Sequence, residues 1–211
     1  MSERKIFVAG ASGAVGRTVV RQALAAGSSL RTHYRKQPEG AAQPGAVVGA
    51  LDDHEWLTEQ LRGQTTVLQL IGTMRKRFAA GDTYETSDIG TTRSLVECAK
   101  RAGTVDHLVL LSSVGAGRPM GAYLRAKAQA ETLVSTSGIA WTTLRPSAFD
   151  GEGHHAPPGM GLLSKLPGLH HLRPISVDDL ARGILHVATT RGPLDAVLEG
   201  DSLFAVIARS A

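Results

Sequence analysis

A glycine-rich turn near the start of the chain limits what this sequence can fold into more than any other feature. The segment 5–17 reads KIFVAGASGAVGR, so a short apolar strand runs directly into three glycines spaced three residues apart, and a helix-forming stretch follows. Gly10 permits a tight turn, Gly13 lets a ligand approach the backbone, and Gly16 lets the helix pack closely on the strand. Because the free N–H groups of such a helix attract phosphate, the pattern favours a dinucleotide site over an ordinary strand–helix turn. The expected contacts are Gly10, Ser12, Gly13, Ala14, Val15 and Gly16.

Strand and helix signals alternate along the chain, which predicts an α/β fold with a doubly wound parallel sheet, a Rossmann fold. Short, nearly continuous apolar runs are typical of parallel strands buried on both faces. At 211 residues the chain fits one domain. We therefore expect a single NAD(P)-binding domain over residues 1–211, with 147–175 as a substrate loop or lid. The expected strands are Ile6–Ala9, Leu30–Tyr34, Ala46–Val48, Val67–Ile71, His107–Leu111, Trp141–Leu144 and Leu203–Ile207, and the expected helices are Gly16–Ala26, Glu55–Leu61, Thr83–Ala102, Tyr123–Ser137 and Ser176–Thr189.

The charge and cysteine content narrow the range of partners. A net charge of +4 suits an anionic ligand such as NADPH but is too small to indicate nucleic acid. The single Cys98 excludes an internal disulfide and lies in an amphipathic helical pattern, so we expect a core residue in a cytoplasmic protein. No apolar run reaches membrane-spanning length, and the charged first residues do not resemble a signal peptide. We expect a monomer or homodimer that binds a small-molecule substrate.

Two pairs of histidines, at 154–155 and 170–171, raise the possibility of a metal site. Adjacent histidines rarely bind one ion together, and no carboxylate or cysteine completes a tetrahedral set beside them. We therefore interpret them as loop residues and expect no metal.

The end of the second strand indicates which nicotinamide cofactor the chain prefers. An acidic residue there binds the adenine-ribose hydroxyls of NAD, whereas an arginine accommodates the 2′-phosphate of NADP. Here the strand ends in Arg35 and Lys36, with no Asp or Glu. The two cations could pair with a phosphate dianion, which favours NADP(H), although they could also be ordinary surface residues.

The fourth strand ends in Ile71, Gly72 and Thr73. Ligands of doubly wound sheets lie outside the carboxyl ends of the strands, so these residues are expected beneath the ribose or pyrophosphate of the cofactor. A basic segment, Arg75–Arg77, follows and is either a phosphate or substrate contact or a solvated loop.

The fifth strand ends in Ser112 and Ser113, and Tyr123 and Lys127 follow on a predicted helix. A spacing of four puts the tyrosine and the lysine on one helix face, which brings the Lys127 ammonium near both the phenol and the ribose of the cofactor. Its positive charge there stabilises a phenolate. The phenol then acts as general acid or base toward a carbonyl or alcohol, and a serine hydroxyl orients the same oxygen. The alternative is a tyrosine packed on the core and a lysine in solvent. We favour Ser113 over Ser112 for the orienting role.

Together these segments resemble the short-chain dehydrogenase/reductase superfamily, in particular its atypical branch. The glycine turn, LSSVGA at 111–116, YLRAKAQAE at 123–131, LRP at 144–146 and VDDLA at 177–181 all match, and the chain is similar to the Tat-interacting reductase-like proteins. The resemblance implies that Asp52, with Leu51 before it, borders the adenine, although Asp52 could instead cap a helix. It also implies that Pro146 borders the nicotinamide. The gap from Ser113 to Tyr123 is shorter than the family pattern.

Three functions fit these motifs. The first is an NADPH-dependent oxidoreductase of a small carbonyl or quinone-like substrate. The second is a non-catalytic NADP(H)-binding sensor or regulatory protein, which has no need of an intact Tyr-x-x-x-Lys pair. The third is a nucleotide-sugar epimerase, which the short stretch after Pro146 disfavours because it leaves little room for a sugar-nucleotide domain.

Overall fold

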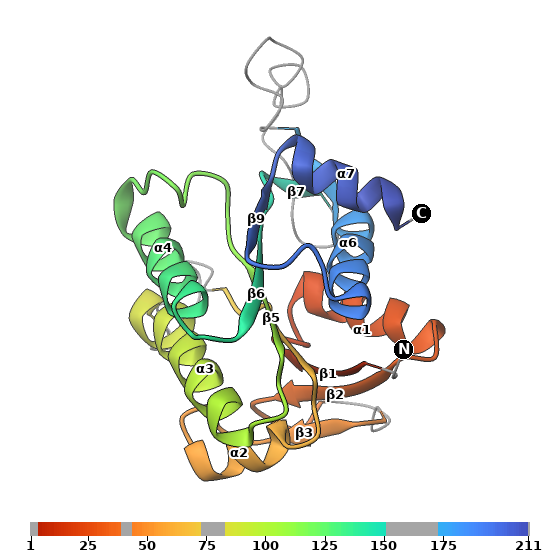
Figure 1. Ribbon diagram of the computed structural model, residues 1–211, viewed down its shortest axis with the longest axis vertical. Coiled ribbons are helices and arrows are strands. Elements are labelled where there is room, and N and C mark those ends of the chain that lie inside the picture. The colour runs from red at the N-terminus through yellow and green to blue at the C-terminus, as the bar shows by residue number, and fades with distance from the viewer. Residues whose placement is uncertain (1–3, 39–43, 73–82, 151–172, 211) are drawn as a thin grey trace.

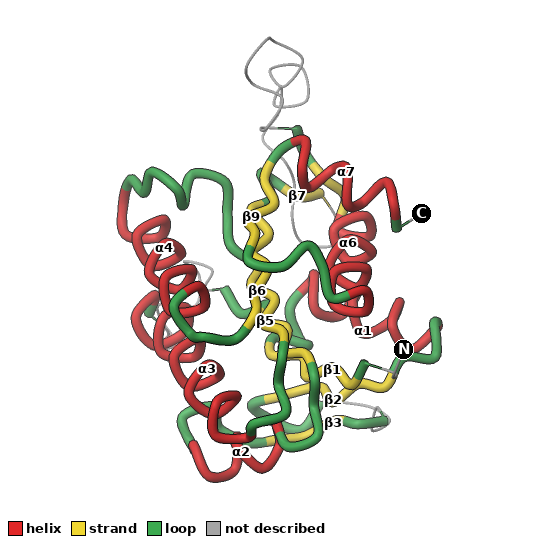
Figure 2. Tube along the Cα trace, viewed as in Figure 1, coloured by secondary structure: helices red, strands yellow, loops and turns green. Residues whose placement is uncertain are grey.

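A parallel sheet of seven strands forms the centre of the protein. The computed structural model describes residues 4–38, 44–72, 83–150 and 173–210. The strand order β3-β2-β1-β4-β5-β6-β9 reverses direction between β1 and β4, so the switch point of the predicted doubly wound fold lies there. Figure 2 shows the strands as a continuous central layer. The strands are β1 Lys5–Ala9, β2 Ser29–Tyr34, β3 Ala46–Val48, β4 Thr66–Gln69, β5 His107–Leu111, β6 Ala140–Arg145 and β9 Ala196–Glu199.

Helices cover both faces of this sheet, as Figure 1 shows. On one face, α1, α6 and α7 pack on a core that includes Ile6, Leu68 and Ile184. On the other, α2, α3 and α4 pack on a second core around Phe7 and Leu110. The alternating residues of each buried strand therefore supply two separate cores, as expected for strands covered on both sides. The helices are α1 Ala14–Ala25, α2 His54–Leu61, α3 Thr91–Ala102, α4 Gly121–Ser135, α6 Val177–Thr190 and α7 Asp201–Arg209, and a two-stranded ribbon joins β7 Phe149–Asp150 to β8 Ile175–Ser176.

The prediction of a last strand at Leu203–Ile207 was wrong. These residues lie in helix α7, where Leu203, Val206 and Ile207 are buried at helical spacing. The last strand of the sheet is β9, which pairs in parallel with β6 and buries only Leu198. A short apolar run does not by itself distinguish a strand from one face of a helix, and a four-residue strand with a single buried side chain has almost no periodic signal.

Several predicted helix ends are confirmed. Gly103 ends α3 in a left-handed conformation, with φ of 71°, and the Ser176 side chain caps α6 by accepting the Asp179 N–H. The alternative role of Asp52 as a cap was wrong, because Asp53 accepts the Trp56 N–H at the start of α2.

The expected helix Thr83–Ala102 consists of two segments of different helix type. Its first part is a π-helix, η2 Tyr84–Gly90, capped by the Thr83 side chain, and α3 follows without a break. A π-helix is rare and frequently marks a functional site. Cys98 is buried in α3 as predicted, and burial raises the pKa of its thiol, which makes it a poor nucleophile. None of the helices described combines the length and apolar character needed to cross a membrane.

Candidate functional site

The three glycines of the first turn differ in what they do for the fold. Gly10 has φ of 96°, and a Cβ added to it would lie 2.9 Å from the Ile71 nitrogen. A Cβ on Gly16 would lie 2.0 Å from the Gly10 carbonyl oxygen, which no backbone tolerates. A Cβ on Gly13 would meet only that oxygen at 3.4 Å, an ordinary contact. The fold itself therefore requires glycine at 10 and 16, whereas the exposed Gly13 leaves open space on its outer side.

This turn presents the start of α1 to a ligand. Gly13 occupies the N-cap position, no side chain caps the helix, and its first turn carries no acidic residue. The guanidinium of Arg17 donates to the Ser12 carbonyl at 2.9 Å, so a positive charge lies over the turn. Exposed Ser12, half-buried Ala14 and buried Val15 complete the segment. Helix N–H groups and a nearby cation together make a site for an anion such as a pyrophosphate.

The ends of β2 and β3 form the neighbouring part of the site. Arg35 and Lys36 follow β2 and are exposed. Buried His33 joins the two strand ends through its Nε2 and the Gly49 carbonyl, 2.9 Å apart. Burial lowers the pKa of His33 below its ordinary range, and the Arg35 charge adds to the effect, so this ring is neutral at pH 7. Beyond β3, Leu51 is buried and Asp52 is exposed.

The end of β4 lies directly against the glycine turn. Leu70 donates its N–H to the Ala9 carbonyl at 2.9 Å, which ties the ends of β1 and β4 together. The Gln69 side chain accepts the Ile71 N–H at 3.1 Å and donates to two threonines of α3. Gly72 is exposed at this edge. Thr73 and the basic segment Arg75–Arg77 lie outside the described residues.

Helix α4 carries the predicted tyrosine and lysine to the same edge. The Lys127 ammonium lies 5.9 Å from the centre of the Tyr123 ring, so the two side chains share a helix face as their spacing predicts. A Cβ on Gly72 would lie 3.3 Å from this ammonium, which places Lys127 beside the end of β4. Lys127 also donates to the Leu111 carbonyl at 3.2 Å and pairs with Asp88 of η2 at 2.9 Å.

The two serines after β5 have different surroundings. The Ser112 hydroxyl is buried and donates to Glu131 of α4, whereas Ser113 is half-buried and has a long hydrogen bond, 3.4 Å, to the Val114 carbonyl. The Ser112 hydroxyl is therefore engaged by Glu131, whereas the Ser113 hydroxyl has only a weak bond within its own loop. Pro146 is buried and accepts the Val114 N–H at 2.9 Å, so it fixes the start of the loop that leads to α4.

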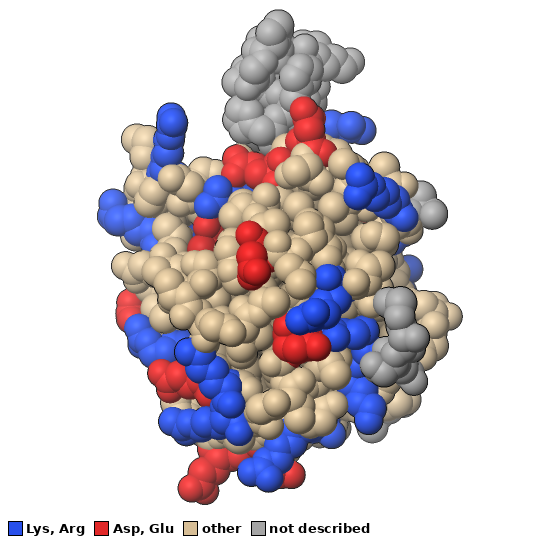
Figure 3. Space-filling view, viewed as in Figure 1, with Lys and Arg blue, Asp and Glu red and all other residues tan. Residues whose placement is uncertain are grey.

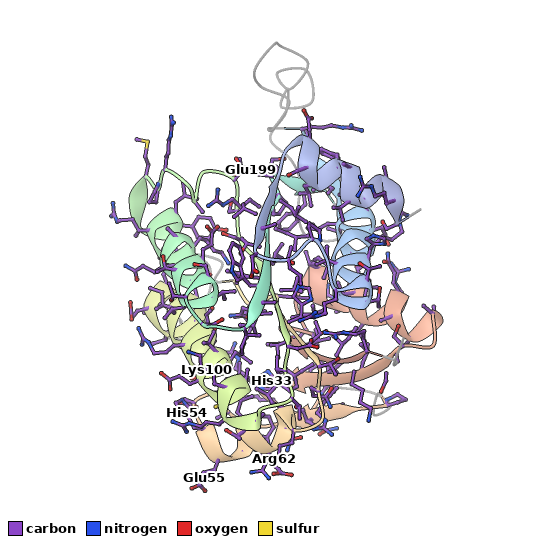
Figure 4. All side chains as sticks on the ribbon, viewed as in Figure 1. His33, His54, Glu55, Arg62, Lys100 and Glu199 are labelled. Carbon is purple, nitrogen blue, oxygen red and sulfur yellow. The ribbon has the colours of Figure 1, made fainter. Side chains whose placement is uncertain are left out.

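An ion network extends from Ser112 across the carboxyl edge of the sheet. Arg145 at the end of β6 binds both carboxylate oxygens of Glu131, at 2.9 and 2.6 Å, and one oxygen of Glu199 on β9 at 3.1 Å. Figure 4 labels Glu199 at the end of its strand. The hydrogen bonds from Glu131, followed by those from Glu199, raise the pKa of Arg145, which stays charged. The Arg145 guanidinium joins α4 to β6 and β9, and Glu131 adds Ser112, the residue after β5.

Sequence reasoning missed Asp88, Glu131 and Glu199. Glu131 follows Lys127 by four residues, so its place on the same face of α4 could have been read from the spacing. Asp88 follows Tyr84 by four residues, and the Tyr84 ring lies 5.7 Å from the Tyr123 ring. Glu199 belongs to the strand that the pattern did not reveal.

Metal binding finds no support in the ranges that the structure describes. No three His, Cys, Asp or Glu side chains there come together in an arrangement that would hold an ion. The histidine pairs at 154–155 and 170–171 lie outside those ranges. On the face shown in Figure 3, basic and acidic side chains are interspersed over the described surface.

Known proteins share the sequence motifs and the fold described above. A family model described as NAD(P)H-binding matches residues 10–191, from the glycine turn to the end of α6. A solved short-chain dehydrogenase/reductase superfamily protein from Agrobacterium tumefaciens, with NAD bound, superposes with a TM-score of 0.71 at 20% identity, covering 98% of this chain and 81% of that one. This likeness shows the fold.

Two curated proteins are similar over most of the sequence. The sterol demethylase protein B of Methylococcus capsulatus is 31% identical over 181 residues, which covers 74% of this chain and 54% of that protein. The (4-alkanoyl-5-oxo-2,5-dihydrofuran-3-yl)methyl phosphate reductase of Streptomyces griseus is 30% identical over 180 residues, covering 82% of this chain and 58% of the reductase. The chain thus spans little more than half the length of these relatives.

Proposed function

The chain belongs to the NAD(P)H-binding family of atypical short-chain dehydrogenase/reductase proteins, and from that membership we propose that it is an NADPH-dependent oxidoreductase of a small carbonyl or quinone-like compound. One observation carries the proposal: the Lys127 ammonium lies between the Tyr123 ring and Gly72, at the carboxyl edge of the sheet. A tyrosine used only for packing would not need a buried cation beside it. The reductase named among the relatives supports the direction of the reaction.

Each residue of the site has a separate role in the proposed reaction. When bound, NADPH supplies a hydride to the substrate carbon. Tyr123 gives its phenolic proton to the carbonyl oxygen, and the charge of Lys127 stabilises the phenolate that remains. The hydroxyl of Ser113 orients the same oxygen by donating a hydrogen bond. The helix N–H groups beyond Gly13 hold the pyrophosphate, and Arg35 and Lys36 pair with the 2′-phosphate.

A panel of carbonyl and quinone substrates, assayed by NADPH oxidation, tests this function. We expect Tyr123→Phe to lower turnover of any active substrate by about 10²-fold or more, the usual scale of general acid–base catalysis, with little change in NADPH affinity. The matched control is Tyr84→Phe, which removes the hydroxyl of the neighbouring ring and should retain turnover. Full activity in Tyr123→Phe would contradict the assigned proton donor.

The hydrogen bonds that the Ser112 and Ser113 hydroxyls already make favour a second candidate, an NADP(H)-binding regulator without turnover. Ser112 is bonded to Glu131, and within the described residues Ser113 bonds only the Val114 carbonyl of its own loop. If wild type binds NADPH but no compound in the panel is reduced, and Tyr123→Phe leaves every measured property unchanged, the regulator replaces the reductase. In either case we propose a small-molecule ligand and a monomer or homodimer.

A further inference from the structure

Two helices meet at the site with matching registers. Tyr84 and Asp88 lie four residues apart on the π-helix η2, and Tyr123 and Lys127 lie four residues apart on α4. The centres of the two aromatic rings lie 5.7 Å apart with the rings tilted by 54°, and the two charges pair at 2.9 Å. The acidic residue is therefore aligned with the lysine in the same way that the two tyrosines are aligned.

The charge pair is removed from water. The Asp88 side chain is fully buried and that of Lys127 is 5% exposed. A buried charge without a partner is costly, because desolvation penalises it and no solvent compensates. Asp88 therefore supplies the opposite charge that a buried ammonium needs beside it.

The contacts of the Lys127 ammonium show which side of it faces the proposed ligand site. An ammonium has three N–H donors. Lys127 gives one to the Leu111 carbonyl and forms an ion pair with Asp88. A Cβ on Gly72 would lie 3.3 Å from the same ammonium, at the edge of the sheet where a doubly wound fold binds its ligand. Two contacts from different elements, η2 and β5, thus fix the ammonium before any ligand arrives.

We propose that Asp88 is a positioning residue, which holds the Lys127 ammonium beside Gly72 and directed at the hydroxyls of the cofactor ribose. The inference rests on the proposed cofactor site and adds to it a residue that acts only through Lys127. Because the carboxylate offsets part of the ammonium charge felt at Tyr123, the main effect is expected on cofactor affinity. Preorganisation of a donor stabilises the bound state, since less side-chain freedom is lost on binding.

A double-mutant cycle measured by calorimetric NADPH titration tests the proposal without relying on turnover. Asp88→Asn keeps the shape of the side chain and removes its charge, and we expect it to weaken NADPH binding by about tenfold or more. Lys127→Met should weaken binding at least as much. In the double variant the Asp88 substitution should cause no further loss, within about twofold, because the residue it acts through is gone.

Two outcomes would overturn the proposal: an unchanged dissociation constant in Asp88→Asn, or losses that multiply in the double variant. Thr142→Val serves as a control for general destabilisation, because it removes a buried hydroxyl bonded to His107 at the start of β5, away from the carboxyl edge, and should leave the affinity unchanged. If Asp88→Asn does not fold, Asp88→Glu keeps the charge, displaces it by one methylene and enters the same cycle.

The result is separable from the test of the reaction. A cycle that behaves as expected in a protein that reduces no substrate removes the reductase and leaves the role of Asp88 intact. Multiplying losses in a protein that does reduce substrates remove only the role of Asp88. Wild type that binds neither NADPH nor NADH would overturn both.

Discussion

Replacing Gly13 by serine should weaken dinucleotide binding strongly without weakening the fold. Gly13 is exposed, and its φ of −73° and ψ of 164° are open to any residue. An added Cβ would meet only the Gly10 carbonyl oxygen, at 3.4 Å. The serine hydroxyl would also cap α1 by accepting N–H groups of its first turn, which the phosphates otherwise need.

The expected magnitudes follow from these contacts. Serine at an N-cap is slightly better than glycine, so the free energy of unfolding should stay within about 0.5 kcal/mol of wild type or rise. A hydrogen bond to a charged group contributes about 1.5–3 kcal/mol, so the loss of two such bonds to phosphate would cost roughly 3–6 kcal/mol. At 1.4 kcal/mol per factor of ten, the dissociation constant for NADPH should rise by about 10²–10⁴-fold.

Urea denaturation and calorimetric titration of the same preparations measure both quantities. The matched control is Gly16→Ala, whose Cβ would lie 2.0 Å from the Gly10 oxygen. We expect that variant to lose stability, at the upper end of the roughly 1–3 kcal/mol typical of overpacked sites. Retained NADPH affinity in Gly13→Ser would show that the phosphates bind elsewhere, and a destabilised Gly13→Ser would refute the distinction drawn between the two glycines.

Two further predictions concern the cofactor and the acid stability of the fold. Arg35→Ala should weaken NADPH binding and leave NADH binding nearly unchanged, since only NADPH carries the 2′-phosphate; equal losses for both, measured by calorimetry, would remove Arg35 from that role. His107 is fully buried on β5, and burial, with the charges of Arg4 and Arg191, lowers its pKa from 6.5 to about 4. The unfolded chain binds this proton near pH 6.5 and the folded chain only near pH 4, so the stability from the neutral ring is complete above pH 6.5 and falls by about 3 kcal/mol as the pH drops to 4. In urea denaturation across this range His107→Gln should lose less stability than wild type, and identical pH dependence would show that other groups titrate instead.

The sequence predicted correctly those features that depend on residues of one short segment. The glycine turn, the start of the helix at Ser176 and the Tyr123–Lys127 face all depend on residues within about one or two helical turns of each other, and the structure has them as the spacing indicated. Pairings between distant residues could not be predicted in the same way. Ser112 and Glu131 are 19 residues apart, and Arg145 and Glu199 are 54 apart, so their contacts depend on how α4 and β9 pack.

The sequence did not predict strand β9, for a related reason. Its four residues bury one side chain, and its place in the sheet comes from pairing with β6 rather than from a pattern of its own. Asp88 was unforeseen because an acidic residue in a helix ordinarily faces solvent, and only the packing of η2 on α4 buries it against Lys127.

The sharing of Arg145 between Glu131 and Glu199 has a consequence for how this protein can diverge. Two carboxylates from α4 and β9 bind different nitrogens of one guanidinium, so a substitution at either changes the electrostatic surroundings of the other, and their effects should be non-additive. A neutral residue at 199 would let Arg145 bind Glu131 alone, whereas a neutral residue at 131 would also release Ser112. Variants accepted on β9 thus depend on the residue present on the helix of Tyr123. Directed evolution of this edge would progress faster with libraries that vary 131, 145 and 199 together than with single-site scans.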